Sequence, residues 1–164
     1  MAAAGWCRKV IQEDKPAKLF LDVGGVGAGV SDRLQEMGLG SKIEAVNFGS
    51  SPIEPAPLDD NGKPFGGPAN RRAEMWLNMK KWLEEPAGVT IPDKDEVQAD
   101  VCGPSYKYDS NTRLLLEKKE DMRRRGVPSP DIGDAIALTF ARPVAPPRPP
   151  LEPIRSTGRG WMSS

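Results

Sequence analysis

Hydrophobic and polar residues alternate along most of the chain with the periods of short helices and strands. Apolar residues at helical spacing predict helices over residues 2–13, 29–37, 71–83, 95–101, 117–125 and 131–140. Short apolar runs predict strands over residues 18–23 and 43–48, and a strand pair within residues 106–116. Because helices and strands alternate at the start of the chain, the pattern predicts an α/β fold with central parallel strands flanked by helices.

Two segments do not carry such a pattern. Residues 49–69 are rich in proline, glycine and aspartate, which predicts a long loop. Prolines recur from residue 143 onward, so residues 143–164 are predicted to form a disordered or polyproline II tail. Residues 1–142 then form the folded domain. A polyproline-binding partner is the alternative to a solvated tail.

Some local contacts can also be predicted from residue type and spacing. Asn70 precedes a predicted helix and is expected to cap its first turn. Arg71 and Glu74 are three residues apart on that helix and are expected to form an ion pair. Tryptophans 6, 76 and 82 are predicted to lie in the core.

Two carboxylates three residues apart open the last predicted helix. At 3.6 residues per turn, Asp131 and Asp134 project from the same face. Carboxylates fixed at one end of a packed helix suit hard cations such as Mg²⁺ or Mn²⁺. The alternative is a helix N-terminus that carries acids because the helix dipole favours them there.

A further acid, Asp22, ends the first predicted strand and precedes a glycine-rich turn over residues 24–29. The carboxyl end of a buried strand is where open α/β sheets place their ligands. The turn could instead be a dinucleotide-binding loop, but its last glycine comes one residue too early for G-x-G-x-x-G. No Walker A sequence is present. We therefore interpret Asp22 as a candidate metal ligand, with a nucleotide-binding α/β domain as an alternative.

The composition excludes several kinds of chemistry. The chain has 164 residues, enough for one domain, and 23 basic residues balance 23 acidic ones. It has no histidine, which excludes Ser-His-Asp and Cys-His catalysis and histidine-ligated zinc. Cys7 and Cys102 have no zinc-site spacing. The sequence contains no long apolar run, which predicts an intracellular protein without a membrane partner.

Basic residues gather just before the acidic helix. The candidates for contact with DNA phosphates are Lys118, Lys119, Arg123, Arg124 and Arg125. Acidic residues are interleaved with them, so a solvated charged helix is the alternative.

Six motifs occur along the chain in a fixed order. They are Leu21-Asp22-Val23 with its glycine-rich turn, Val46-Asn47-Phe48-Gly49, Asn70-Arg71-Arg72-Ala73-Glu74-Met75-Trp76, Ile91-Pro92-Asp93, residues 117–126, and Ser129-Pro130-Asp131-x-x-Asp134-Ala135. In this order they resemble the C-terminal nuclease domain of tailed-phage terminase large subunits. The resemblance covers roughly residues 5–142.

The resemblance implies a ribonuclease-H-like, or resolvase-like, fold that cuts double-stranded phage DNA during genome packaging. Such nucleases hold two divalent metal ions, here Mg²⁺ or Mn²⁺, roughly 3.5–4 Å apart on a cluster of carboxylates. The implied metal ligands and catalytic residues are Asp22, Asp134 and Asp131. Asp134 is the first choice of the last pair, because the Asp-Ala-hydrophobic pattern follows it.

The chain also departs from the family. The family's first catalytic aspartate lies on a strand upstream of the first helix here, and the packaging ATPase domain is not present. We therefore expect a partial nuclease domain of phage or prophage origin, acting in the host cytoplasm, whose sheet lacks its first strands and has an exposed edge. The implied partners are double-stranded DNA, the missing N-terminal half of the terminase, the small terminase subunit and the portal. An inactive structural or interaction remnant of the packaging motor is the alternative.

Overall fold

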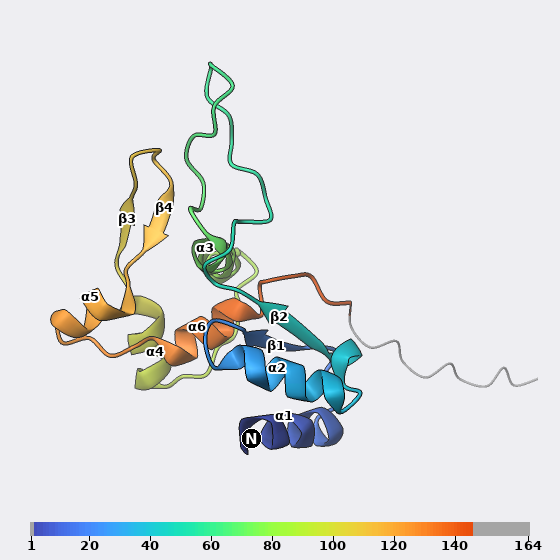
Figure 1. Cartoon of the computed structure of the whole chain (residues 1–164). Coiled ribbons are helices and arrows are strands. Elements are labelled where there is room, and N and C mark those ends of the chain that lie inside the picture. Colours follow the sequence, from blue (N-terminus) through green and yellow to red (C-terminus); the bar gives the residue numbers. More distant parts are fainter. Residues whose placement is uncertain (1, 146–164) are drawn as a thin grey trace, which may run out of the picture.

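The computed structural model describes residues 2–145 of the chain. In chain order the elements are α1 (Ala2–Glu13), β1 (Leu19–Asp22), α2 (Gly27–Glu36), the 3-10 helix η1 (Gly40–Lys42), β2 (Ile43–Val46), α3 (Arg71–Leu83), α4 (Asp95–Cys102), β3 (Tyr106–Tyr108), β4 (Leu114–Leu116), α5 (Lys119–Arg124) and α6 (Asp131–Leu138). Figure 1 shows their arrangement. Every predicted helix and strand is present, and most of the predicted tail lies outside the described residues.

The central sheet consists of β1 and β2, which run parallel from the pair Leu19 and Ile43 to the pair Asp22 and Val46. Side chains alternate across a strand, so each strand contributes to two different cores. Leu19 and Leu21 pack toward α1 and α2, whereas Phe20 packs toward α3 and α6. The parallel strands are therefore covered by helices on both faces, as predicted.

The core on the α3 side is the one that supports the acidic helix. Its buried side chains include Met75, Trp76 and Met79 from α3, and Ala137 and Leu138 from α6. α6 also contacts α4 and the strand β1. Asp131 and Asp134, at the start of α6, are thus attached to a packed helix beside the sheet.

α1 covers the other face of the sheet, through small and medium side chains. Ala4, Cys7 and Ile11 are buried against Leu34 of α2. This spacing makes one stripe along a helix, and Trp6 lies off that stripe. The Trp6 side chain is 64% exposed, so its prediction as a core residue is wrong. Trp76 is buried, as predicted.

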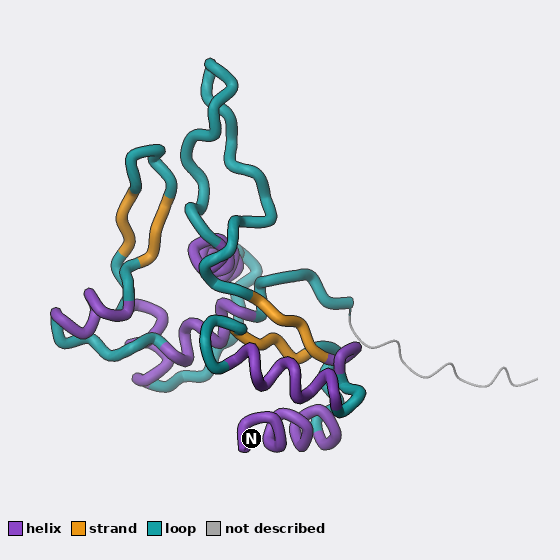
Figure 2. The backbone as a smooth tube through the Cα atoms, viewed as in Figure 1, coloured by secondary structure: helices purple, strands orange, loops and turns teal. Residues whose placement is uncertain are grey.

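Two arms project from the same side of the body in Figures 1 and 2. One is the predicted loop, residues 49–69, and the other is the antiparallel hairpin of β3 and β4. The arms are joined where Leu114 donates its backbone N–H to the Gly67 carbonyl and accepts the N–H of Ala69. The loop is tied to α3 as well, through backbone bonds from Arg71 and Arg72 to Ser50 and Phe48.

The central sheet contains β1 and β2 alone within residues 2–145. The edge of β1 that faces away from β2 is therefore unpaired in this part of the chain. A groove of about 1070 Å³ lies nearby, lined by Phe20 of β1, by Phe140 and by Arg71 and Glu74 of α3. In the part of the chain that the structure describes, no helix is long and apolar enough to cross a membrane.

Candidate functional site

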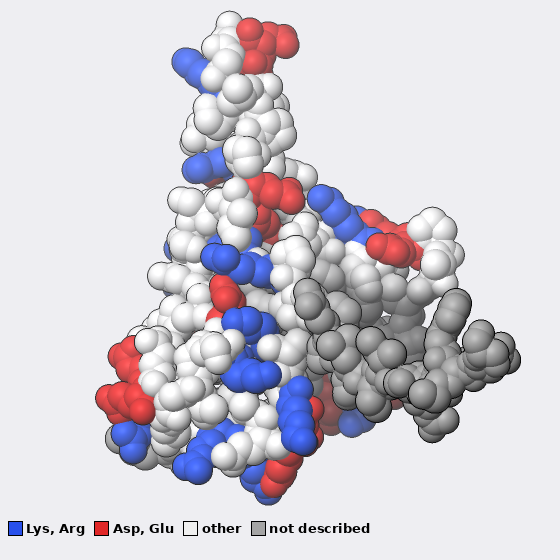
Figure 3. Space-filling model, turned by 90° about the vertical axis from the view of Figure 1, so that its right-hand side faces the viewer, with Lys and Arg blue, Asp and Glu red and all other residues white. Residues whose placement is uncertain are grey.

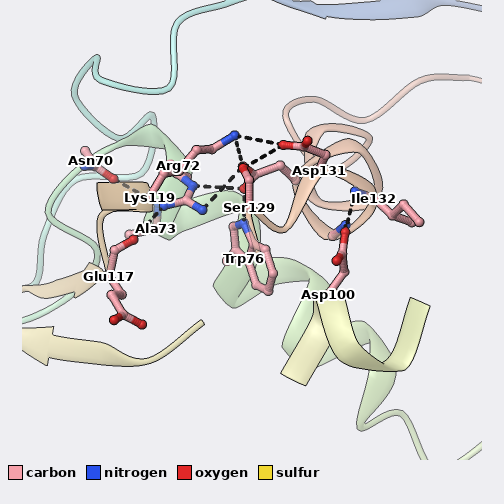
Figure 4. Close-up of polar contacts among 12 residues, drawn as sticks. Asn70, Arg72, Ala73, Trp76, Asp100, Glu117, Lys119, Ser129, Asp131 and Ile132 are labelled. Carbon is pink, nitrogen blue, oxygen red and sulfur yellow. Dashed lines mark hydrogen bonds and ion pairs between the residues drawn. The ribbon is translucent and has the colours of Figure 1, made fainter. Parts of the chain in front are cut away.

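The first turn of α6 is fixed in place by Asp100 of α4. Its Oδ2 atom accepts the backbone N–H of Ile132 at 2.6 Å and that of Gly133 at 3.3 Å (Figure 4). Gly133 is closely packed, since a Cβ atom there would lie 2.9 Å from the Trp76 ring and 3.0 Å from the Asp100 carbonyl oxygen. Sequence reasoning missed Asp100, because its partners lie more than thirty positions away and no local motif marks it.

Asp134 is the centre of a buried polar network. Its carboxylate accepts hydrogen bonds from Arg72 Nε at 2.9 Å, Arg72 Nη2 at 3.3 Å and Trp76 Nε1 at 2.9 Å. The Lys119 Nζ atom lies 3.1 Å from Oδ2. Both oxygens are therefore engaged by donors from α3 and α5, and the side chain is only 7% exposed.

Asp131 has a different environment one turn earlier. Its side chain is 78% exposed, and its Oδ1 accepts bonds from Ser129 Oγ at 2.7 Å and Lys119 Nζ at 3.2 Å (Figure 4). The Ser129 hydroxyl, together with Lys119, holds the pKa of Asp131 below its usual value despite some desolvation. Among the described residues no group donates to Oδ2 of Asp131, so one oxygen of this carboxylate is open. Because its pKa is lowered, the carboxyl group is ionised at neutral pH.

Asp22 lies at the carboxyl end of β1 and is partly buried. Its Oδ1 atom accepts the backbone N–H of Gly24 at 2.9 Å. A Cβ atom at Gly27 would lie 1.8 Å from the Asp22 carbonyl oxygen, so the start of α2 needs a glycine there. The glycine-rich turn thus brings α2 close to the end of β1, while Oδ2 of Asp22 accepts no hydrogen bond from the described residues.

The structure brings some of the predicted ligands together and not others. Lys119 contacts both Asp131 and Asp134, whereas no hydrogen bond joins Asp22 to either of them. Within residues 2–145, no three acidic or cysteine side chains form a group able to hold a metal ion. Hard cations prefer carboxylate oxygens as ligands. Among the three predicted ligands, Asp22 and Asp131 each have one oxygen that accepts no hydrogen bond from a described residue. Both oxygens of Asp134 already accept hydrogen bonds or ion-pair contacts, so Asp134 is the least open of the three predicted ligands.

The five basic candidates divide into separate environments. Lys118 is exposed and lines a recess of about 140 Å³ with Asn70, Arg72 and Lys107. Lys119 points at the acids of α6 (Figure 4). The exposed set also contains Arg123, which makes no ion pair with a described residue, and Arg124, which pairs with Asp121 at 3.0 Å.

Arg125 serves the fold itself. Its Nε and Nη2 atoms lie 2.8 and 2.7 Å from the two Glu117 oxygens, and Nη2 also donates to the Gly103 carbonyl. This bidentate contact links the residue that follows β4 to the residue that follows α5. The guanidinium of Arg125 is therefore already occupied, unlike the ammonium group of Lys118.

We predict that Arg125→Met raises the pKa of Glu117 from about 2 toward its ordinary value of 4.5. The hydrogen bond from Arg125 is the largest cause of the low pKa, followed by the N–H of Ser105. Because the pKa is lower in the folded state, this pair stabilises the fold above about pH 4.5, and the effect is lost as pH falls toward 2. A carboxyl NMR titration measures the pKa, and Arg124→Met is the matched control. An unchanged Glu117 pKa in Arg125→Met would contradict the assignment.

Charge is unevenly distributed over the surface. On the face in Figure 3, Lys and Arg side chains follow a line through the middle, with some Asp and Glu side chains among them and others at the tip of the upper arm and at the edges. The whole-chain charge of zero therefore hides local regions of one sign.

Two parallel strands covered by helices on both faces, with Asp22 at the end of one strand, form a mixed α/β fold. The chain is similar to the nuclease domain of the large terminase subunit gp2 of bacterial virus Sf6, at 22% sequence identity and a TM-score of 0.61, over 87% of this chain and 72% of that one. A lysine-to-alanine mutant of that domain with manganese matches at 22% identity and a TM-score of 0.63, over 85% and 72% of the two chains. A structure of the same lysine-to-alanine mutant with calcium matches at 25% identity and a TM-score of 0.63, over 85% of this chain and 71% of that one.

These likenesses confirm the predicted fold: the chain has the fold of the nuclease domain of a phage large terminase subunit. No sequence-family model matches the chain, and no curated protein matches it.

Proposed function

We propose that this chain is a divalent-metal-dependent endonuclease domain that cuts double-stranded phage DNA during genome packaging. The observation that carries the proposal is the shared fold with a terminase nuclease domain over 85% of the chain. Structures of that domain are described with manganese and with calcium, which supports a divalent cation as the cofactor. For this chain the physiological ion would be Mg²⁺ or Mn²⁺.

Asp22 and Asp131 are the proposed direct ligands. Each is a carboxylate with one oxygen that no described donor engages, and the elements that carry them, β1 and α6, are in contact. When bound, divalent ions activate a water molecule and stabilise the leaving oxygen of a phosphodiester. Asp134, the first choice from sequence, is the third proposed ligand, and it also holds Arg72 and Lys119.

The site needs further carboxylates, and the unpaired edge of β1 is where we propose they enter. A strand that pairs with this edge would place its side chains beside Asp22. Residues 1–142 would then be part of a nuclease domain, and the N-terminal half of the terminase is the proposed source of the strand. The small terminase subunit and the portal are further proposed partners in the host cytoplasm.

DNA phosphates would be held by the exposed basic residues nearest the acids. Lys118 and Lys107 line the same recess next to Arg72, and Arg72 bonds Asp134 directly. Such contacts are independent of base sequence and weaken as salt rises. Arg123 and Arg124, farther along α5, are proposed to contact DNA phosphates in the same way.

Mn²⁺ binding by the full chain, measured by calorimetry, tests the proposal. We expect Asp22→Asn and Asp131→Asn each to weaken binding by at least about tenfold, because each removes a charged ligand. Glu84→Gln is the control, since Glu84 forms an exposed pair with Lys80 on α3. Unchanged affinity in both ligand variants would refute the site. The absence of any metal response would favour the inactive remnant of the packaging motor.

A further inference from the structure

The hairpin of β3 and β4 has two chemically different faces. Side chains alternate along a strand, so Tyr106 and Tyr108 share one face of β3 and Lys107 lies on the other. Lys107 lines the recess of about 140 Å³ next to Arg72, whereas both tyrosines line a separate groove of about 460 Å³, the tyrosine groove. The hairpin projects from the body of the molecule (Figure 1).

The tyrosine groove is strongly apolar. Tyr106 and Tyr108 are 64% and 59% exposed, and their rings pack edge to face with centroids 6.0 Å apart. The rest of the lining comes from α3, from the region around the end of α4 and from β4. Among the described lining residues Lys80 alone is charged, and it is paired with Glu84. Adjoining exposed apolar side chains, unlike scattered ones, mark a binding surface.

The chain itself contains a segment with the chemistry that such a groove binds. Aromatic-lined grooves are surfaces on which extended, proline-rich segments dock. Residues 146–164 lie outside the described part of the chain, and their prolines are Pro146, Pro147, Pro149, Pro150 and Pro153. Large apolar residues are interspersed with these prolines and follow them, at Leu151, Ile154, Trp161 and Met162.

This segment starts close enough to reach the tyrosine groove. Ala145 and Asn78 line the groove beside β1, whereas Lys80 and Leu83 line the tyrosine groove. At 3.6 residues per turn, Asn78 projects from α3 on the side opposite to Lys80 and Leu83. A path half-way round a helix about 10–12 Å in diameter is about 16–19 Å long, which polyproline II covers in about five or six residues. Residues from about 151 onward therefore reach the groove.

We propose that residues 151–162 bind in the tyrosine groove of their own chain, with residues 146–150 as the connection around α3. Attachment through a short linker gives an effective concentration in the millimolar range. A binding constant of about 0.1 mM then fills the groove in about nine-tenths of the molecules. The proposal does not depend on the nuclease function, since the groove lies on the face of the hairpin opposite to Lys107.

A nitroxide label on Cys102 tests the proposal in the full chain. Cys102 is exposed and follows Val101, which lines the groove, whereas Cys7 is buried. We expect the oxidised label to remove at least about half of the Trp161 indole N–H signal in an NMR spectrum, relative to the reduced label, because the segment fills most of the grooves. Trp161→Phe identifies the signal, and Trp76, which lines the groove, is the positive reference.

Two variants test whether the groove is the binding surface. Tyr106→Ser combined with Tyr108→Ser removes the aromatic wall and should restore the Trp161 signal. Phe65→Ser is the matched control, because Phe65 is an aromatic residue that is 53% exposed and lies on the other arm, outside the groove lining. It should leave the loss of signal unchanged. Tyr108→Ser alone is used if the double variant does not fold.

The alternative occupants give different results. Equal Trp161 signals with the oxidised and reduced label would overturn the proposal and leave the groove to a segment of another protein. Equal loss in the double tyrosine variant would also overturn it, because the segment would then lie near Cys102 without using the groove. Signal loss in isotope-enriched, unlabelled chains mixed with labelled ones would show that the segment enters a second copy instead. None of these measurements uses metal or DNA, so the proposal can fail while the proposed nuclease function stands.

Discussion

Replacing Asp134 by alanine is expected to lower the free energy of unfolding by about 3–5 kcal/mol, the range for breaking one side of a buried ion pair. The substitution leaves the Arg72 guanidinium, only 11% exposed, without its carboxylate, and it removes the acceptor of the Trp76 indole N–H. Single domains are stable by only about 5–15 kcal/mol, so the variant would be close to unfolding. Urea denaturation followed by tryptophan fluorescence measures the change.

Asp131→Ala is the matched control for this prediction. It removes the same kind of side chain one turn away, but from an exposed position, and is expected to change stability by less than about 1 kcal/mol. Asp134→Asn keeps the size and one acceptor oxygen, so its loss should be smaller than that of Asp134→Ala. Equal stabilities for Asp131→Ala and Asp134→Ala would show that the network does not support α6.

The Asp134 network also shows why the site could be predicted only in part. The spacing of Asp131 and Asp134 predicted two acids on one face of a helix, and the structure has both at the start of α6. It could not distinguish them, because two of the residues that donate to Asp134, Arg72 and Trp76, lie 62 and 58 positions away. Burial and partners of a side chain depend on tertiary packing, which a local motif does not encode.

Local predictions succeeded where the physics is local. Asn70 caps α3 by accepting the N–H of Ala73, and Arg71 pairs with Glu74 one turn along the helix, both as predicted. The prediction for Trp6 is wrong, because Ala4, Cys7 and Ile11 form the buried stripe of α1 and its largest side chain lies off that stripe.

The basic residues of positions 118–125 also show that a local motif does not determine the partners of a side chain. Lys118, Lys119 and Arg125 are equivalent in the sequence, yet the structure gives each a different environment. Arg125 is held by Glu117, eight residues earlier, across a turn between β4 and α5. Charge runs therefore predict where cations gather, and the fold determines which of them remain available to a phosphate.

Glu74 forms the second buried network on which stability is expected to depend. Its carboxylate accepts the backbone N–H groups of Ile53 and Glu54 at 2.9–3.0 Å and pairs with Arg71, which also donates to the Ala141 carbonyl. Glu74 and Arg71 thus join the long loop, α3 and the segment that follows α6. Burial alone would raise the pKa of Glu74, but these donors outweigh burial and leave the pKa below its ordinary value of 4.5.

We therefore predict that Glu74→Ala costs about 3–5 kcal/mol, because it leaves Arg71 and two backbone donors without their acceptor. Since the folded pKa is lowered, the wild type should hold this stability above about pH 4.5 and lose it as pH falls through the folded value. The difference between wild type and Glu74→Ala should accordingly narrow in acid, as measured by urea denaturation at several pH values. Glu84→Ala, on the exposed end of the same helix region, is the control and should cost less than about 1 kcal/mol. A stability difference that stays constant from neutral to acidic pH would show that the Glu74 charge does not hold the loop to α3.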